Sequence, residues 1–282
     1  MLIVDAQVHI WGGDTPERPW PSPRQVQPHR EEPFSKDDLL REMGAAGVHR
    51  AVIVPPMWEG DRNDLALEAA RLHPGRFAVM GRLDPESPAS RGMMATWRQQ
   101  PGMLGLRMVF KRPLVRRILS EGRADWLWKE AEQAGVPIMV LIDSAQLGLI
   151  DQVAGRHPGL KLAIDHMALT TGAKDEEAFE ELDKLLAVAS RPNLAVKATC
   201  LPGYTRDSYP FRRLHPYLRR VHDAFGSKRI FWGTDVTHLP CSYTQAITMV
   251  MEEIPWLTAE DKDWIMGRGI CEWLGWPMPA ES

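Results

Sequence analysis

Cysteine is scarce in this sequence of 282 residues. The three cysteines, Cys200, Cys241 and Cys271, are odd in number and show no paired spacing. This argues against a disulfide framework and predicts a reducing, cytoplasmic setting. Tyrosine is scarce too, with four residues against 11 tryptophans. Indole rings either pack a core or form the wall of a pocket for a flat ligand, and the count alone does not separate these two uses.

The sequence also lacks a strong charge of either sign and any long apolar run. The net charge is −3 and the pI is near 6.3, so no overall field favours nucleic acid or an acidic membrane. No apolar run approaches the roughly 20 residues that a membrane-spanning helix needs, and Asp5 stands where a signal peptide would have its apolar segment. We expect a cytoplasmic protein with a small-molecule substrate and no nucleic-acid or membrane partner. Whether it forms a homo-oligomer stays open.

Short apolar segments alternate with helical patterns along the whole chain. Eight segments rich in Val, Ile, Leu or Phe are typical of buried parallel strands: Leu2–His9, Ala51–Val54, Phe77–Gly81, Leu104–Val109, Ile138–Ile142, Leu160–Ile164, Leu194–Ala198 and Ile230–Gly233. The helical patterns cover Lys36–Ala46, Asn63–Leu72, Trp126–Ala134, Gln146–His157, Glu176–Ser190, Pro216–Phe225 and Tyr243–Glu253. Several of them end at a glycine, and the next strand follows closely.

Eight strands alternating with helices predict an α/β protein with a (β/α)8 TIM barrel, formed as a single domain by residues 1–282. The structural rival is a doubly wound open sheet, but such a sheet usually has fewer strands and a glycine-rich first turn. Residues 12–33 contain too many prolines for a helix. This stretch is expected to form a long loop on the face of the barrel where loops build sites.

Polar residues stand at the predicted carboxyl ends of the strands, where a barrel of this kind gathers its functional side chains. Each has a structural explanation as well, since a buried histidine, a turn-capping aspartate or an ion-paired lysine needs no function. Charged groups are rarely placed inside a barrel mouth without a partner or a task, so the set as a whole favours a functional site. The candidates are Asp5, Gln7 and His9, which are expected to point the same way, then Arg107, Lys111, Arg112, Asp143, Asp165, His166, Lys197, Asp235 and His238.

Four segments resemble the amidohydrolase superfamily, and more narrowly its amidohydrolase-2 branch of sugar lactonases, pyrone-dicarboxylate lactonase and related decarboxylases. They are Val4-Asp-Ala-Gln-Val-His-Ile-Trp11, Gly105-Leu-Arg107, Ile164-Asp-His-Met167 and Phe231-Trp-Gly-Thr-Asp235. By this resemblance His9 matches the second histidine of a His-x-His pair whose first position is Gln7. His166 and Asp235 match the family's strand-6 histidine and strand-8 aspartate.

The resemblance also bears on metal. The predicted fifth strand lacks the histidine or modified lysine of metal-dependent relatives, with Asp143 as the nearest candidate. Gln7 is a weak ligand for zinc, because its amide oxygen is neutral. We therefore favour no metal. The remaining set of His9, His166 and Asp235 would still allow one divalent ion, zinc or manganese.

The first functional hypothesis is a lactonase-like hydrolase that opens a lactone or another cyclic ester or amide. Asp235 would act as the general base, and His9 and His166, with Gln7 as a neutral donor, would stabilise the carbonyl oxygen. Arg107, helped by Lys111 or Arg112, would hold an anionic group of the substrate. Further substrate contacts are expected from Lys197, His238 and the loop tryptophans Trp11, Trp20 and Trp58. The alternatives are a metal-dependent decarboxylase of an aromatic or muconate-type acid, and a ligand-binding barrel whose site has decayed.

Overall fold

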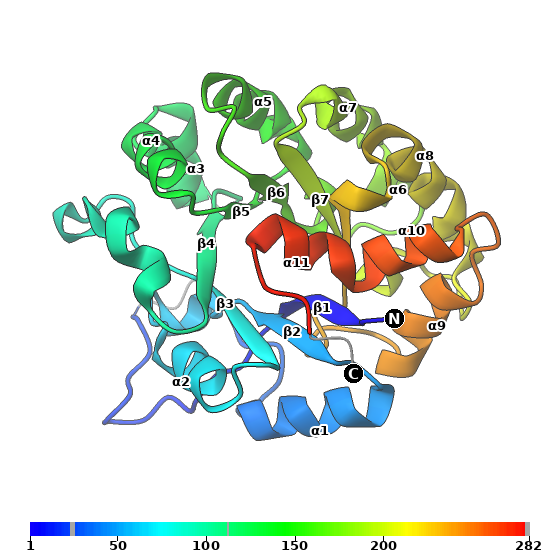
Figure 1. The fold of residues 1–282 in the computed structure, drawn as a ribbon, viewed down its shortest axis with the longest axis horizontal. Coiled ribbons are helices and arrows are strands. Elements are labelled where there is room, and N and C mark those ends of the chain that lie inside the picture. Colours follow the sequence, from blue (N-terminus) through cyan, green and yellow to red (C-terminus); the bar gives the residue numbers. More distant parts are fainter. Residues whose placement is uncertain (23–25, 112, 280–282) are drawn as a thin grey trace.

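Eight parallel strands form the centre of the protein in a computed structural model that describes residues 1–22, 26–111 and 113–279. The strands follow one another in chain order around the sheet, with helices outside them (Figure 1). This confirms the predicted (β/α)8 barrel. The strands are β1 (Val4–Val8), β2 (Arg50–Ile53), β3 (Phe77–Gly81), β4 (Met103–Val109), β5 (Ile138–Leu141), β6 (Leu162–Ile164), β7 (Leu194–Thr199) and β8 (Ile230–Gly233).

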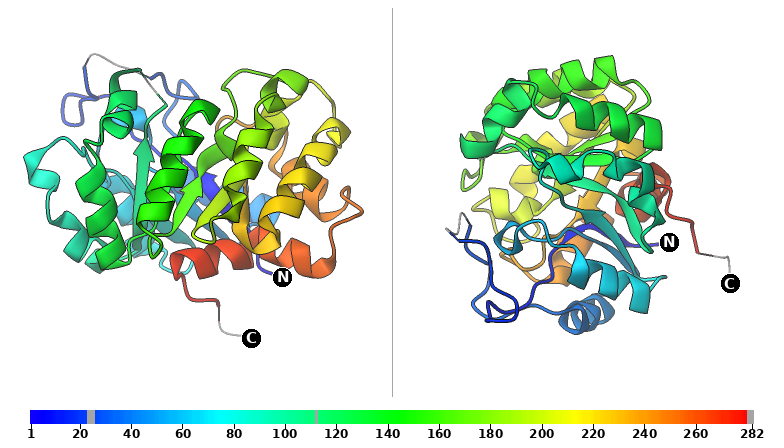
Figure 2. Two further views of the ribbon diagram at one scale, coloured as in Figure 1. Left: turned by 90° about the horizontal axis from the view of Figure 1, so that it is seen from above. Right: turned by 90° about the vertical axis from the view of Figure 1, so that its left-hand side faces the viewer.

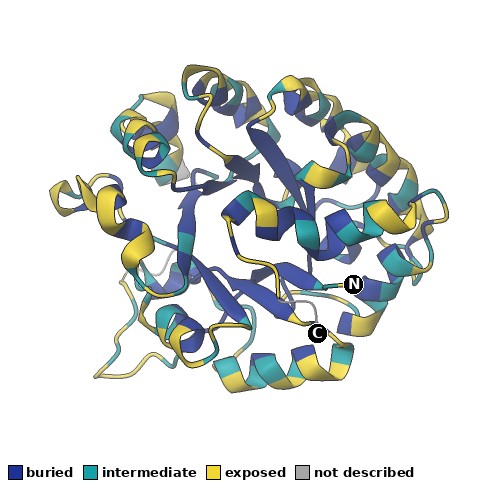
Figure 3. Ribbon diagram, in the orientation of Figure 1, coloured by how far each residue is buried: buried dark blue, intermediate teal, exposed yellow. Residues whose placement is uncertain are grey.

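The helices bury one face against the strands and expose the other (Figure 3). Helix α1 begins at a Ser35–Asp38 capping box and ends at Gly47, whose φ of 76° suits glycine. The helices are α1 (Lys36–Ala46), α2 (Asp64–Leu72), α3 (Pro113–Ser120), α4 (Asp125–Ala134), α5 (Leu147–Arg156), α6 (Glu176–Phe179), α7 (Leu182–Ala187), α8 (His215–Phe225), α9 (Tyr243–Met251), α10 (Ala259–Asp263) and α11 (Gly269–Leu274).

The helical predictions need correction in two respects. The segment Glu176–Ser190 is not one helix, because Glu181 leaves helical geometry with φ −101° and ψ 17° and separates α6 from α7. Helices α3 and α10 were not predicted at all. No helix in the described part of the chain has both the length and the apolar character needed to cross a membrane.

The two ends of the sheet meet through individual hydrogen bonds between the end of β8 and β1. The backbone N–H of Asp235 donates to the carbonyl of Gln7 at 2.8 Å. The Asp5 carboxylate accepts from the backbone N–H of Thr234 at 2.9 Å and from the Tyr243 hydroxyl at 2.6 Å. Burial raises the pKa of Asp5 to about 6, although these donors oppose the shift. Asp5 therefore fastens β8 and α9 to β1.

Asp5 does not share a direction with Gln7 and His9, contrary to the sequence prediction. The register of β1 against β2 shifts between Asp5 and Val8. Such an irregularity breaks the alternation of side chains along a strand. As a result Val4 and Ala6 join the apolar cluster inside the barrel, whereas Val8 belongs to the cluster between strands and helices.

One end of the barrel is closed and the other carries the loops. Ile270, Cys271 and Leu274 of α11 pack into the interior cluster, and α11 lies across the end where the N-terminus begins (Figure 2). The long segment between β1 and α1 lies at the opposite end in the same view. Side chains that follow the strands therefore open towards this loop.

At Gly233 there is no room for a side chain between β8 and its neighbours. An added Cβ would lie 2.7 Å from the Thr199 methyl group, 2.8 Å from Asp5 Oδ1 and 2.9 Å from the Gln7 nitrogen. We predict that Gly233→Ala lowers the free energy of unfolding by about 1–3 kcal/mol, as overpacking does. Gly44→Ala in α1, where an added Cβ meets nothing within 4 Å, should instead raise it by about 0.5–1 kcal/mol. Urea unfolding of both variants checks the pair, and equal effects would contradict the close approach.

Candidate active site

The predicted residues His9, His166 and Asp235 come together at the open end of the barrel. They line one cavity of about 280 Å³. His9 Nε2 lies 3.6 Å from Asp235 Oδ1, and this carboxylate oxygen is buried without a hydrogen-bond partner among the described residues. An unpartnered buried carboxylate oxygen is costly, so Asp235 is held ready for a group that enters the cavity.

The backbone at two of these positions is strained. His166 and Asp235 have φ values of 50° and 51°, in the left-handed region. Residues other than glycine lose roughly 1–2 kcal/mol there, and such strain gathers at functional sites. Each lies two residues after the end of a strand, β6 or β8, so the strain turns their side chains into the cavity mouth.

Hydrogen bonds fix His9 as a neutral ring with an acceptor nitrogen towards the cavity. The ammonium group of Lys197 can only donate, and it donates to Gln7 Oε1. The amide nitrogen of Gln7 therefore faces His9 Nε2, at 3.2 Å, and donates to it. His9 Nδ1 in turn donates to the Val54 carbonyl at 2.6 Å. Burial lowers the pKa of His9 to about 4, against the attraction of Asp235, so the ring carries no charge at neutral pH.

His166 faces Thr199 through its Nδ1. This nitrogen lies 2.7 Å from the Thr199 hydroxyl oxygen, which is fully buried, and 3.4 Å from the Thr199 carbonyl oxygen. The hydroxyl can donate to Nδ1 or accept from it, whereas the carbonyl can only accept. Desolvation lowers the pKa of His166 to about 4, although the Asp235 and Asp165 carboxylates oppose it. The cavity is thus lined by two histidines, His9 and His166, that carry no charge at neutral pH.

A buried ion-pair group supports the cavity from below. Asp165 lies 2.9 Å from Arg107 Nε and 2.9 Å from Lys197 Nζ. Burial by itself would raise the pKa of Asp165, but the two cations outweigh it and hold the pKa well below its usual value. Because Nε of Arg107 is used in this pair, its two terminal nitrogens face the cavity, and they have no hydrogen-bond partner among the described residues.

The other predicted residues divide into those that line the cavity and those behind it. Trp58, Arg107, Lys111 and His238 line it. Lys111 is tied to the Leu169 carbonyl at 2.7 Å and lies 3.3 Å from Asp143. Four further residues are absent from the described lining: Gln7, Trp11, Trp20 and Lys197. Trp11 packs behind Trp58 with ring centroids 5.2 Å apart. Arg112 lies outside the described residues.

His29 is a cavity residue that the sequence did not single out. It lies in the long loop between β1 and α1, and its Nδ1 is 3.9 Å from Asp235 Oδ1. Its ring is 5.0 Å from Trp58 and 4.8 Å from His238, centroid to centroid. Desolvation lowers the pKa of His29. The sequence indicated only that His29 lies in a loop expected at the open end of the barrel. That does not predict where its side chain points.

The four histidine rings around Asp235 outweigh the effect of burial on its pKa. Burial raises its pKa, but His9, His29, His166 and His238 together hold it below the usual value. Asp235 is therefore a carboxylate at neutral pH. A carboxylate beside neutral imidazoles suits proton transfer from a bound water.

The amidohydrolase family model matches residues 4–269 of this chain. The chain belongs to the amidohydrolase family. This confirms the resemblance and the expectation of a hydrolase.

Two curated relatives are lactone-opening enzymes by name. The L-fucono-1,5-lactonase of Burkholderia ambifaria is 25% identical over 82% of this chain and 79% of its own. The 4-sulfomuconolactone hydrolase of Hydrogenophaga intermedia is 25% identical over 83% of this chain and 74% of its own. An amidohydrolase from Burkholderia multivorans, crystallised with bound zinc, has a TM-score of 0.81 at 20% identity, over 98% of this chain and 100% of that one.

The residues of this amidohydrolase do not fit a resident divalent ion. In residues 1–22, 26–111 and 113–279, no group of three or more His, Cys, Asp or Glu side chains is arranged to hold a metal. The nitrogen of His9 that would bind an ion already accepts from the Gln7 amide, and the Lys197 ammonium lies behind that amide. A catalytic zinc needs three protein ligands and an open position. Here a hydrogen-bond donor, the Gln7 amide, faces the His9 nitrogen that would be one of these ligands.

The neutral histidines predict a pH dependence of stability. His9 and His166 take a proton near pH 6.5 when unfolded but only near pH 4 when folded, so the unfolded state binds more protons between these values. Stability should fall as the pH is lowered from 6.5 to 4. Asp5, whose pKa is raised to about 6 in the folded state, has the opposite effect on stability. It is one group against two histidines, so the histidines determine the direction. Urea unfolding at pH 7 and pH 5 measures the slope. His166→Gln should reduce it, and greater stability at pH 5 would contradict the assignment.

Proposed function

We propose that this amidohydrolase opens a lactone, or another cyclic ester or amide, of a small carboxylated substrate. The observation that carries the proposal is the Asp235 carboxylate, whose buried Oδ1 has no partner among the described residues and lies 3.6 Å from the acceptor nitrogen of His9. This free carboxylate oxygen can accept a hydrogen bond from a water molecule that enters the cavity. The names of the two curated relatives support a lactone as the substrate class.

Asp235 is the general base of the proposed reaction. It accepts a proton from the water as the water oxygen attacks the carbonyl carbon, and it returns the proton to the ring oxygen when the carbon–oxygen bond breaks. The Nε2 lone pair of His9 is already used by the Gln7 amide, so the neutral His9 ring lines the space beside Asp235 and takes no proton. Gln7 acts on His9 and not on the substrate, because its amide fixes which nitrogen of His9 is the acceptor.

His166 stabilises the developing oxyanion in this mechanism. It does so in the tautomer that has the proton on Nε2, in which the Thr199 hydroxyl donates to Nδ1. A fixed donor in a site shielded from water stabilises charge that appears in the transition state. Arg107 holds the anionic group of the substrate with its terminal nitrogens, since a planar guanidinium matches a carboxylate. Lys111 adds a positive charge at the same side of the cavity.

The two alternative functions have less support. Metal-dependent decarboxylation needs an ion at His9, His166 and Asp235, where the Gln7 amide already donates to His9. A decayed site would not be expected to keep a buried aspartate with a free oxygen beside two neutral histidines. Three free cysteines fit the cytoplasm as the compartment of the proposed enzyme.

Asp235→Asn tests the general base. We expect kcat to fall roughly 100- to 10,000-fold, the usual contribution of a general base, with KM little changed because the amide has the shape of the carboxylate. Initial rates on L-fucono-1,5-lactone and muconolactone, read by proton release, measure the effect. Asp37→Asn in α1, where the side chain is 72% exposed, is the matched control. Near wild-type activity of Asp235→Asn would refute the role.

Metal independence is tested on the purified wild-type enzyme. We expect less than stoichiometric zinc and manganese by elemental analysis, and lactone turnover that survives prolonged incubation with a chelator, because the His9 nitrogen is occupied by an amide donor. The control is the same treatment followed by added zinc, which should not raise the rate. Stoichiometric metal whose removal abolishes turnover would sink the metal-free mechanism.

A further inference from the structure

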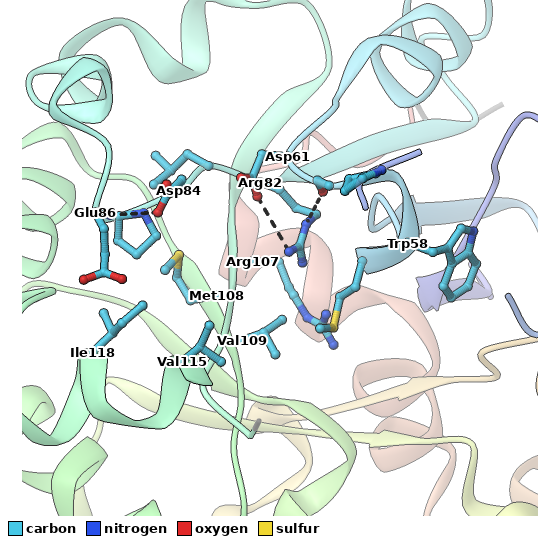
Figure 4. Close-up of a pocket in the computed structure, with 15 residues that line it drawn as sticks. Trp58, Asp61, Arg82, Asp84, Glu86, Arg107, Met108, Val109, Val115 and Ile118 are labelled. Carbon is cyan, nitrogen blue, oxygen red and sulfur yellow. Dashed lines mark hydrogen bonds and ion pairs between the residues drawn. The ribbon is translucent and has the colours of Figure 1, made fainter. Parts of the chain in front are cut away.

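A second cavity opens beside the first at the mouth of the barrel. It has a volume of about 290 Å³ and shares Met57, Trp58 and Arg107 with the reactive cavity. Figure 4 shows Arg82 and Arg107 near the Trp58 side of this space, with Val115 and Ile118 on the other side. None of the reactive groups His9, His166 and Asp235 lines it. The space is therefore additional to the reaction centre but adjoins it through Arg107.

Arg82 enters this cavity with an incompletely satisfied guanidinium group. Its Nε donates to the Gly60 carbonyl at 2.9 Å, and its Nη2 lies 3.7 Å from Asp61, beyond hydrogen-bond length. Its Nη1 is buried and has no hydrogen-bond partner among the described residues. The side chain is 12% exposed, so little water reaches this charge, and burying a donor without a partner is costly.

Arg107 brings a second cation to the same space. Burial, helped by the charge of Arg107, lowers the pKa of Arg82 to about 10, and Asp61 opposes the shift. The carboxylate next to Arg107 is Asp165, which binds its Nε and is shared with Lys197. The side chains of Arg82 and Arg107 thus line one cavity, and two like charges there repel each other until an anion joins them.

Three carboxylates, Asp61, Asp84 and Glu86, also line the cavity, but no hydrogen bond joins any of them to Arg82 or Arg107. Asp84 accepts from the backbone N–H of Glu86 at 2.9 Å, and Glu86 pairs with Arg123 outside the cavity. Asp61 is the remaining carboxylate, and it is 44% exposed. The opposite wall is apolar, with Met108, Val109, Val115 and Ile118. A ligand that fits this space has an oxyanion at one end and carbon at the other.

We propose that the second cavity is a subsite for a carboxylate or similar oxyanion, bound between Arg82 and Arg107, with its carbon skeleton against the apolar wall. This subsite deepens the proposed function. It rests on that function in one respect: the bound oxyanion belongs to the far end of the lactone whose ring lies in the reactive cavity. Arg82 would then be a specificity residue for anionic lactones, acting together with Arg107.

Sulfate binding tests the anion subsite without any turnover. Isothermal titration of the full-length enzyme with sodium sulfate should give a dissociation constant that rises roughly 10- to 100-fold in Arg82→Gln, because hydrogen bonds to a charged group are lost. Arg82→Lys should be intermediate, since it keeps the charge and loses the planar fork. Asp61→Asn should bind sulfate about 2- to 5-fold more tightly, because a competing carboxylate is gone. A purely structural role of Arg82 does not produce this opposite effect.

Arg41→Gln on α1, 70% exposed, is the surface control and should bind sulfate like the wild type. Crystals soaked in sodium selenate locate the anion directly, and an anomalous peak between Arg82 and Arg107 supports the subsite. A peak elsewhere, or unchanged sulfate affinity in Arg82→Gln, overturns it.

The link to the substrate is tested with a pair of lactones. Arg82→Gln should raise KM roughly 10-fold or more for muconolactone, which has a carboxylate, and leave KM for uncharged γ-valerolactone unchanged. If the wild type opens neither lactone but sulfate binding still depends on Arg82, the proposed function fails and the anion subsite stands. If lactones are opened and both KM values respond equally to Arg82→Gln, the function stands and the specificity role of Arg82 falls.

Discussion

A fully buried ammonium group organises this active site. Lys197 has no exposed surface, and an isolated charge in such a place would be very unfavourable. It is tolerated because Asp165 supplies the counter-charge and Gln7 supplies an acceptor. Each partner is fixed by this need in turn. Asp165 holds Nε of Arg107, which turns the terminal nitrogens of that arginine to the cavities, and the Gln7 amide determines which nitrogen of His9 accepts.

Charge balance explains why the histidines stay neutral. Around the axis of the barrel, Arg107 and Lys197 are positive and Asp165 and Asp235 are negative, and all four are buried. Protonating His9 or His166 would add an uncompensated charge in a place of low dielectric, which is why burial dominates their lowered pKa values. A divalent ion beside His9 would add two positive charges to the same surroundings. The donor geometry and the electrostatics thus point the same way.

The fold could be predicted from the sequence, and so could the part of the site that lies at the strand ends. Short apolar runs and glycine stops encode the alternation of strands and helices, and the strand ends then place His9, His166 and Asp235 in one mouth. The β1 irregularity that turns Asp5 away could not be seen, because a one-residue change of register leaves no mark in the apolar pattern. His29 and Arg82 were missed for a different reason. Both come from segments without periodicity, and their positions depend on packing against Trp58 and Gly60 that only the folded chain defines.

Gln7 and Lys197 are best understood as a matched pair. A histidine at position 7 also has one acceptor and one donor nitrogen, but its rigid ring sets them differently from the oxygen and nitrogen of the amide. A neutral residue at position 197 would leave the Gln7 amide free to turn and Asp165 with Arg107 alone. Either change by itself breaks a buried hydrogen bond or ion pair, and partial satisfaction of such a network is worse than its absence. The glutamine in the first strand is therefore not the loss of a single ligand. It is one half of an arrangement that fixes His9 as an acceptor, and the ammonium that makes this stable lies 190 residues further along the chain.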